Sequence, residues 1–80
     1  MTCYTVYLYD KDNDDYSQGI VFSTEEQARI VAEGLEPLLK QGMIVNRVFD
    51  NEPFDCVEIV KYSDDCVNPT GDRIAVYPQE

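Results

Sequence analysis

The residues with the clearest potential for chemistry form an acidic run near the start of the chain. Asp10, Asp12 and Asp14 alternate with other polar residues, and Asp15 follows directly. Oxygen ligands at the first, third and fifth positions of a loop are typical of calcium binding. A complete loop of this kind also needs glycine at position six and a bidentate glutamate at position twelve, where this chain has Asp15 and Val21. We therefore expect an acidic loop without a bound metal.

Catalytic chemistry finds little support in the sequence. The chain has no histidine to activate a serine or cysteine, and it has no glycine pattern of a nucleophile elbow or phosphate-binding loop. Adjacent carboxylates are common, but a catalytic pair needs a cleft that raises the pKa of one member. A chain of 80 residues has one thin core and little material for such a cleft. We expect a single domain over residues 1–80, no enzymatic activity and no cofactor.

The cysteines indicate free thiols. The chain has three cysteines, an odd number, at Cys3, Cys56 and Cys66. They lack CxxC spacing, and no histidine is present to complete a zinc site. Cys3 and Cys56 fall in predicted strands, where cysteine packs as a small hydrophobe. The sequence also lacks a secretory signal and any apolar stretch near 18 residues, so we expect a cytoplasmic protein that does not contact membranes.

A hairpin should position the acidic run. Residues 3–9 are rich in β-branched and aromatic side chains and alternate, which predicts a first strand. Residues 20–22 are apolar and can pair back on it as a short second strand. Asp10, Asp12, Asp14 and Asp15 then occupy the hairpin tip.

One helix follows the hairpin. Ser23 and Glu26 fit a capping box, and Gly42 is a suitable residue just after the helix end. Pro37 interrupts the pattern, so we expect a kink, or a break with a short second segment over residues 37–41. The predicted apolar stripe comprises Ala28, Val31, Leu35, Leu38 and Leu39.

The rest of the chain returns to strands. Residues 43–49 and 54–62 are predicted to form a hairpin, and residues 73–77 a last strand after a turn at residues 68–71. The predicted order is ββαβββ, an α+β fold with the helix on one face of a mostly antiparallel sheet.

The opposite face of that sheet must tolerate solvent or a partner. The residues predicted to face the helix are Val6, Leu8, Val57, Ile59, Ile74 and Val76. Those predicted to face away are Thr5, Tyr7, Tyr9, Glu58, Val60, Tyr62, Ala75 and Tyr77. Tyrosines gathered in this way either cover the sheet or form a binding surface, because tyrosine is enriched at binding hot spots.

Charge narrows the class of partner. The chain has 16 acidic and 6 basic residues, a net charge of −10, and every predicted loop is acidic. Such a surface repels phosphates, which argues against direct binding of nucleic acid or anionic membranes. It favours a basic protein partner, although acid can also serve solubility alone. The candidate contact residues are Asp10, Asp12, Asp14, Asp15, Asp64, Asp65, Tyr7, Tyr9, Tyr16 and Tyr62.

The small size, acidic loops, outward tyrosines, lack of histidine and the helix sequence STEEQARIVAEGL after a short hairpin resemble small phage-encoded inhibitors of host defence, the anti-CRISPR and anti-restriction proteins. The resemblance implies an inhibitor that docks on the cationic nucleic-acid-binding surface of a CRISPR effector or other nuclease and blocks target DNA. An alternative is a small assembly protein that joins a complex or forms a homodimer through its open sheet face or a sheet edge. A calcium-responsive module is a third candidate.

Overall fold

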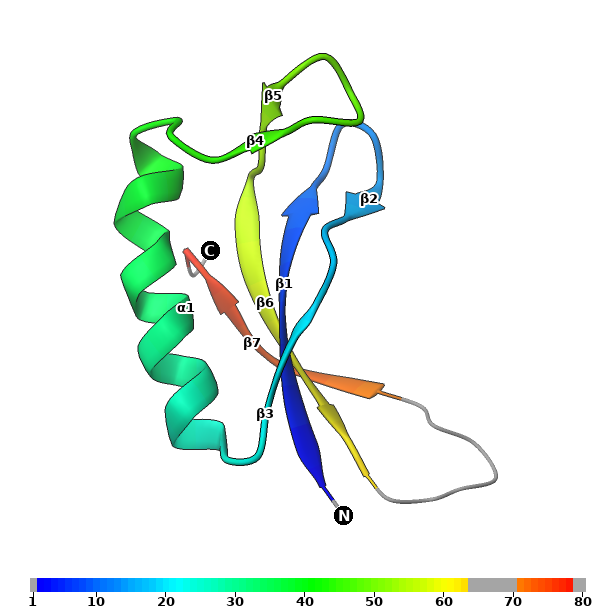
Figure 1. Ribbon diagram of the computed structural model, residues 1–80, viewed down its shortest axis with the longest axis vertical. Coiled ribbons are helices and arrows are strands. Elements are labelled where there is room, and N and C mark those ends of the chain that lie inside the picture. The colour runs from blue at the N-terminus through cyan, green and yellow to red at the C-terminus, as the bar shows by residue number, and fades with distance from the viewer. Residues whose placement is uncertain (1, 64–70, 79–80) are drawn as a thin grey trace.

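The computed structural model describes residues 2–63 and 71–78, in which one helix packs against a mostly antiparallel sheet (Figure 1). This is the α+β class that the sequence predicts. Its elements are β1 (Cys3–Asp10), β2 (Asp15–Tyr16), β3 (Ile20–Phe22), α1 (Glu25–Lys40), β4 (Val45–Asn46), β5 (Glu52–Pro53), β6 (Cys56–Tyr62) and β7 (Gly71–Tyr77).

Strand β1 lies inside the main sheet. One of its edges pairs antiparallel with β6, and the other pairs first with β3 and then with β2. Strand β7 adds to the far edge of β6. The predicted hairpin between residues 3–9 and 20–22 is confirmed, with Thr5 opposite Val21.

The predicted hairpin between residues 43–49 and 54–62 is wrong. Only β4 forms in the first segment, and it pairs with the two-residue β5 in a separate small sheet. The chain turns early because Asp50 and Asn51 adopt positive φ angles of 54° and 57°, which these residue types tolerate. Strand β6 instead has both edges occupied, by β1 and β7.

Helix α1 begins one residue later than the predicted capping box. Thr24 is the N-cap, and its Oγ1 accepts from the Gln27 backbone N–H at 3.2 Å. At the other end Gly42 has φ +68°, and the Met43 N–H donates to the Leu38 carbonyl at 3.0 Å. This is a Schellman cap, so the predicted helix end is confirmed.

The helix runs through Pro37 as one element, so of the two predicted alternatives, a kink or a break, the break with a separate segment over residues 37–41 is wrong. Proline lacks the N–H that would donate to the Glu33 carbonyl. Both residues are exposed, so water can replace the missing donor. The exposed position of Pro37 therefore limits the cost of keeping a proline inside the helix.

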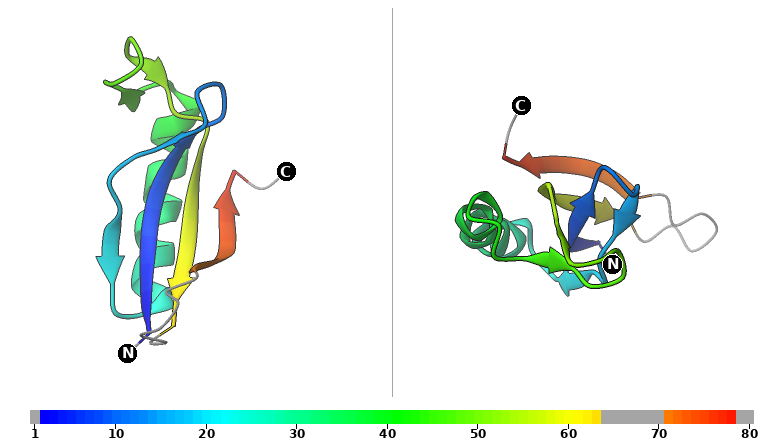
Figure 2. Two further views of the ribbon diagram at one scale, coloured as in Figure 1. Left: turned by 90° about the vertical axis from the view of Figure 1, so that its right-hand side faces the viewer. Right: turned by 90° about the horizontal axis from the view of Figure 1, so that it is seen from above.

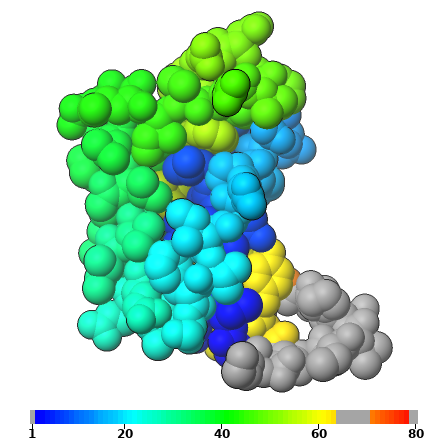
Figure 3. Space-filling view, in the orientation of Figure 1, coloured from blue at the N-terminus to red at the C-terminus, as the bar shows by residue number. Residues whose placement is uncertain are grey.

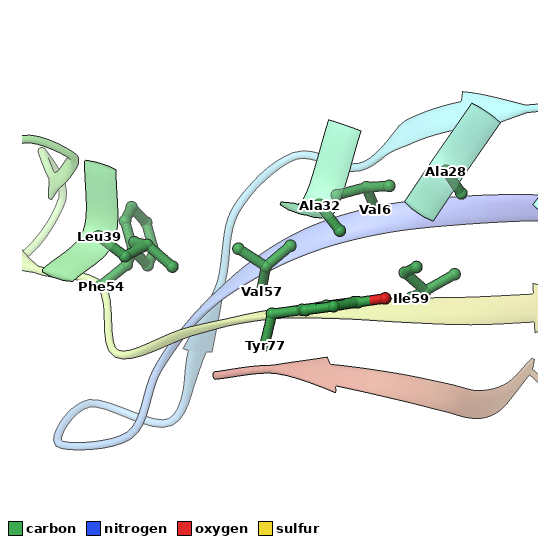
Figure 4. Packing of buried hydrophobic residues seen from close by; sticks show 8 residues of the cluster. All are labelled: Val6, Ala28, Ala32, Leu39, Phe54, Val57, Ile59 and Tyr77. Atoms are coloured by element: carbon green, nitrogen blue, oxygen red, sulfur yellow. The ribbon is translucent and has the colours of Figure 1, made fainter. Parts of the chain in front are cut away.

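The core lies between α1 and the sheet (Figure 4). Ala28 and Ala32 are fully buried, and their small side chains let the helix approach Val6 and Ile59 closely. Ala32 was absent from the predicted stripe, and Leu35 at its centre is only half-buried. The buried apolar cluster comprises Val6, Ala28, Ala32, Leu39, Phe54, Val57, Ile59 and Tyr77.

A register shift between Ile59 and Val60 changes which side chains of β7 face the helix. Ala75 lies opposite Ile59, and Tyr77 lies opposite Val57, so both turn toward α1 and not away from it as predicted. Val76 lies opposite Glu58 on the other face, again contrary to prediction. An extra residue in one strand reverses the alternation beyond it, and the sequence does not show where this happens.

Figure 2 shows that α1 covers one face of the sheet, while the other face has no covering helix. This open face is therefore the main surface left for function.

Helix α1 is 16 residues long, and no helix in the described ranges is long and apolar enough to span a membrane.

Candidate binding surfaces

The acidic loop after β1 and the β4 to β5 turn meet at one end of the molecule. Asn13 joins them, because its Nδ2 donates to Asp10 Oδ2 at 2.8 Å and to Glu52 Oε2 at 3.0 Å. In Figure 3 the green residues between β4 and β5 lie against the light-blue residues of the first loop. We call residues 10–15 and 46–55 together the acidic end.

A buried carboxylate, Asp10, organises the acidic end and is only 1% exposed. The Asn46 Nδ2 donates to Asp10 Oδ2 at 3.1 Å and to Asp15 Oδ2 at 3.0 Å. The side-chain hydrogen bond from Asn13 lowers the pKa of Asp10 below its ordinary value against an opposing effect of burial, and Asn46 adds to the lowering. Asp10 therefore ties the loops together and is not open to a partner, although the sequence made it a contact candidate.

Three carboxylates of the acidic end come close enough to raise the question of a cation. Oxygens of Asp10, Asp12 and Glu52 lie within 4.8 Å of one another. Asp10, however, already accepts from two asparagine amides, and the other two side chains are exposed. The hydrogen bonds of the loop explain the arrangement, so we assign no metal to it.

The acidic end carries seven carboxylates against two cationic side chains, Lys11 and Arg47, which gives a formal charge of −5. The Lys11 backbone N–H donates to Asp55 Oδ2 at 2.6 Å and fixes the start of β6 beside the loop. With a Debye length of about 8 Å at physiological salt, neighbouring charges act together. The exposed carboxylates of this end are Asp12, Asp14, Asp50, Glu52 and Asp55.

Four tyrosines form a connected row on the open sheet face, which we call the tyrosine face: Tyr7, Tyr9, Tyr16 and Tyr62. Tyr9 and Tyr16 are cross-strand partners with ring centroids 4.4 Å apart. Tyr16 meets Tyr7 edge to face at 5.8 Å, and the Tyr7 and Tyr62 hydroxyls share a hydrogen bond of 2.9 Å. The structure thus brings together the four tyrosines that were candidate contacts, although Tyr77, also predicted on this face, is absent from it. Tyr77 takes no part, because its hydroxyl accepts from Arg29 Nη1 of α1 at 3.0 Å.

Tyr9 connects the tyrosine face with the acidic end. Its hydroxyl donates to Asp14 Oδ1 at 2.6 Å, and this bond raises the pKa of Tyr9 to about 12. The hydrogen bond with Tyr7 likewise raises the pKa of Tyr62 to about 12. The two surfaces are therefore contiguous, and these two hydroxyls remain protonated at neutral pH.

The floor of the tyrosine face holds a second buried carboxylate. Glu58 lies between Tyr7 of β1 and Val76 of β7, and it is 3% exposed. Among the described residues its one ion-pair or hydrogen-bond partner is Arg73, whose Nη1 lies 3.8 Å from Glu58 Oε2. Glu58 and Arg73 together line two open hollows of about 650 and 640 Å³.

Two predicted contacts, Asp64 and Asp65, lie outside the described residues, as do Cys66 and most of the predicted turn at residues 68–71. Tyr62, the last residue of β6, pairs with Cys3 at the first end of β1. Asp10 and the acidic end lie at the other end of β1. The thiols of Cys3 and Cys56 are free, and Cys56 is buried as expected.

The sequence interpretation missed the polar residues that organise both surfaces. No neighbouring residue in the sequence indicates the role of Asn46, because its carboxylate partners lie 31 and 36 residues away in the chain. The strand sequence CVEIVKY does single out Glu58, because it is the lone acidic residue there. A carboxylate among apolar strand residues needs a partner or a ligand, and Arg73 is that partner here.

The chain matches no known family model, and the searches of curated proteins and of solved structures also find no significant match. Function must therefore be inferred from the acidic end and the tyrosine face.

Proposed function

We propose that this protein binds a basic protein and acts without chemistry, by occupying a surface that would otherwise hold nucleic acid. The proposed partner is a CRISPR effector or another nuclease with a cationic DNA-binding surface. The observation that carries the proposal is the acidic end, where Asn13 and Asn46 hold two segments together with a formal charge of −5. Fixed carboxylates in such a cluster can replace phosphates opposite lysine and arginine.

The tyrosine face supports the same proposal. Its rings lie directly beside the acidic end through the contact between Tyr9 and Asp14. Tyrosine supplies a large, stiff contact area, and arginine stacks well on aromatic rings. A basic partner would thus meet charge for steering and aromatic area for retention.

A competition experiment tests this proposal. Labelled target DNA is bound to guide-loaded CRISPR effectors and to restriction nucleases, and its release is followed by fluorescence anisotropy as this protein is added. We expect DNA release by at least one of these enzymes, with an apparent affinity that falls steeply as salt rises. The protein alone should leave the anisotropy of free DNA unchanged.

Matched charge variants make the test specific. The double variant Asp12→Asn and Asp14→Asn removes two charges from the acidic end, and asparagine keeps an acceptor for the Tyr9 hydroxyl. Its control, Glu26→Gln with Glu33→Gln, removes two charges from exposed positions of α1. Only the first pair should weaken inhibition. Equal potency of the two double variants, or DNA and protein bound together at saturation in every enzyme, would contradict the proposal.

Assembly through a sheet edge is the second candidate function. In the described part of the chain β3 is an edge strand, and its Ile20 and Val21 are 52% and 65% exposed. Exposed apolar edge strands favour pairing with another chain. Sedimentation across a concentration series tests this candidate, since a monomer at all concentrations would remove the homodimer.

A further inference from the structure

Glu58 is a buried charge with an incomplete partner. Its side chain is 4% exposed, yet the Arg73 Nη1 lies 3.8 Å away, beyond hydrogen-bond distance. The side chain of Arg73 is itself 61% exposed. Removing a carboxylate from water is unfavourable unless a close cation or hydrogen bonds compensate. The arrangement therefore leaves Glu58 able to accept a better-placed cation.

Aromatic rings surround the open side of this carboxylate. Glu58 lines the hollow of about 640 Å³ together with Tyr7, Tyr16 and Tyr62. The rings of Tyr7 and Tyr16 meet at 74°, so they present walls in two directions. Burial raises the pKa of Tyr16, and the negative charge of Glu58 adds to the rise.

Gly71 fixes the position of one wall of the hollow. It lines the hollow, and a Cβ there would lie 2.6 Å from Cε1 of Tyr62. The absence of a side chain thus lets the Tyr62 ring lie directly against the backbone of β7. A volume of about 640 Å³ is within the range of about 300–1,000 Å³ that is usual for small-ligand sites.

We propose that this hollow binds the guanidinium group of an arginine from the basic partner, seated between the tyrosine rings and paired with Glu58 in place of Arg73. This inference rests on the proposed function and names its anchoring contact.

Charge and shape together favour arginine over other occupants. A carboxylate floor attracts cations and repels phosphate, and aromatic walls favour a cation that can stack. The planar guanidinium can stack on a ring while it donates two parallel hydrogen bonds to a carboxylate, whereas a lysine ammonium is a compact and strongly hydrated charge.

The test uses a small probe and no partner protein. Nα-acetyl-arginine amide is titrated into isotope-labelled protein, and the backbone amide signals are followed by NMR. Nα-acetyl-citrulline amide has nearly the same shape without the charge and serves as the control ligand. We expect saturable shifts centred on Tyr7, Glu58 and Arg73 with the arginine probe, and binding at least about tenfold weaker with citrulline.

Three variants extend the test. Glu58→Gln should weaken arginine binding about tenfold, whereas Glu33→Gln, the same change at an exposed helix position, should not. Arg73→Gln should strengthen binding, because it removes the internal competitor of the probe. This change also leaves the buried Glu58 without its ion-pair partner, so the variant is compared only after circular dichroism shows that it is folded, and Glu58→Gln tests the site independently. Equal binding of both probes, shifts confined to the acidic end, or an Arg73→Gln variant that binds no better would overturn the proposal.

The outcome is separable from that of the proposed function. If arginine binds in the hollow but no DNA is released in the competition experiment, the cation site is supported and the inhibitor function is contradicted. DNA release with no arginine binding in the hollow would do the reverse.

Discussion

The hydroxyls of Tyr7 and Tyr62 lie 2.9 Å apart, although the two residues are separated by 55 positions in the chain. Each ring also covers a glycine on a neighbouring strand or loop. A Cβ at Gly19 would lie 2.7 Å from Cε1 of Tyr7, and a Cβ at Gly71 would lie 2.6 Å from Cε1 of Tyr62. The two rings are thus held by close fit against backbone as well as by their shared hydrogen bond.

The first prediction concerns the titration of Tyr62. Its hydrogen bond with Tyr7 raises its pKa from 10.0 to about 12, so Tyr7→Phe should return it toward 10. The neutral hydroxyl stabilises the fold below pH 10, and this contribution is lost as the pH rises toward 12. Tyrosinate absorbance during alkaline titration measures the change. The control is Tyr4→Phe, on the helix side of the sheet, which should not change the part of the absorbance rise that occurs near pH 12. If Tyr7→Phe also left that part of the rise unchanged, the assignment to Tyr62 would be contradicted.

The second prediction compares two glycines. Gly71→Ala should destabilise the protein by about 1–3 kcal/mol, because the new methyl group would overlap with the side chains of Val60 and Tyr62. Gly34→Ala in α1 should stabilise it by about 0.5–1 kcal/mol, since a Cβ there meets no atom within 4 Å and alanine favours helix. Urea unfolding followed by circular dichroism measures both. Similar midpoints for the two variants would show that Val60 and Tyr62 do not pack closely against β7 at Gly71.

The third prediction concerns acid. The hydrogen bond from Asn13 lowers the pKa of Asp10 below its ordinary value, so the charged carboxylate stabilises the fold at neutral pH, and this contribution is lost as the pH falls through the lowered pKa. Asn46→Ala removes one of the hydrogen bonds to Asp10, and we expect it to cost about 1–3 kcal/mol. Asp10→Asn should flatten the acid limb of a plot of stability against pH. Asp12→Asn, which changes an exposed carboxylate, should keep the wild-type acid limb.

The fourth prediction concerns the helix core. Leu39 is 7% exposed and belongs to the buried cluster, so Leu39→Ala should cost about 2–5 kcal/mol. Leu35 is half-buried at the edge of that cluster, so Leu35→Ala should cost clearly less. Thermal unfolding of both variants gives the order. The reverse order would mean that the helix is rotated about its axis.

The sequence predicted the elements that depend on local patterns. Strand β1, its return through β3, the helix and its Gly42 cap follow from alternation, period and capping chemistry. The faces of β7 did not follow, because the register shift beside Ile59 depends on pairing with a distant strand. The short β4 depends on positive φ angles at Asp50 and Asn51, which asparagine and aspartate permit but do not require.

The candidate site divides in the same way. The tyrosine face was predictable, since alternation places Tyr7, Tyr9 and Tyr62 on one side of the sheet. The burial of Asp10 was not, because an aspartate run gives no sign of which carboxylate will meet distant amides. Glu58 was placed on the correct face, but its burial was not predicted, because its neighbours Tyr7 and Val76 come from strands that only the pairing of the sheet brings beside it.

The last prediction separates the roles of the two surfaces once a nuclease target is in hand, and it rests on the proposed function. Exposed charges mainly steer association, whereas desolvated aromatic contacts slow dissociation. The double variant Asp12→Asn and Asp14→Asn should therefore slow association and reduce its dependence on salt, with little change in dissociation. Tyr16→Leu should leave association nearly unchanged and speed dissociation, because Tyr16 contacts both Tyr7 and Tyr9 at the centre of the row. Surface plasmon resonance at several salt concentrations measures both rates, and two variants that alter the same rate constant would show that charge and rings act as one contact.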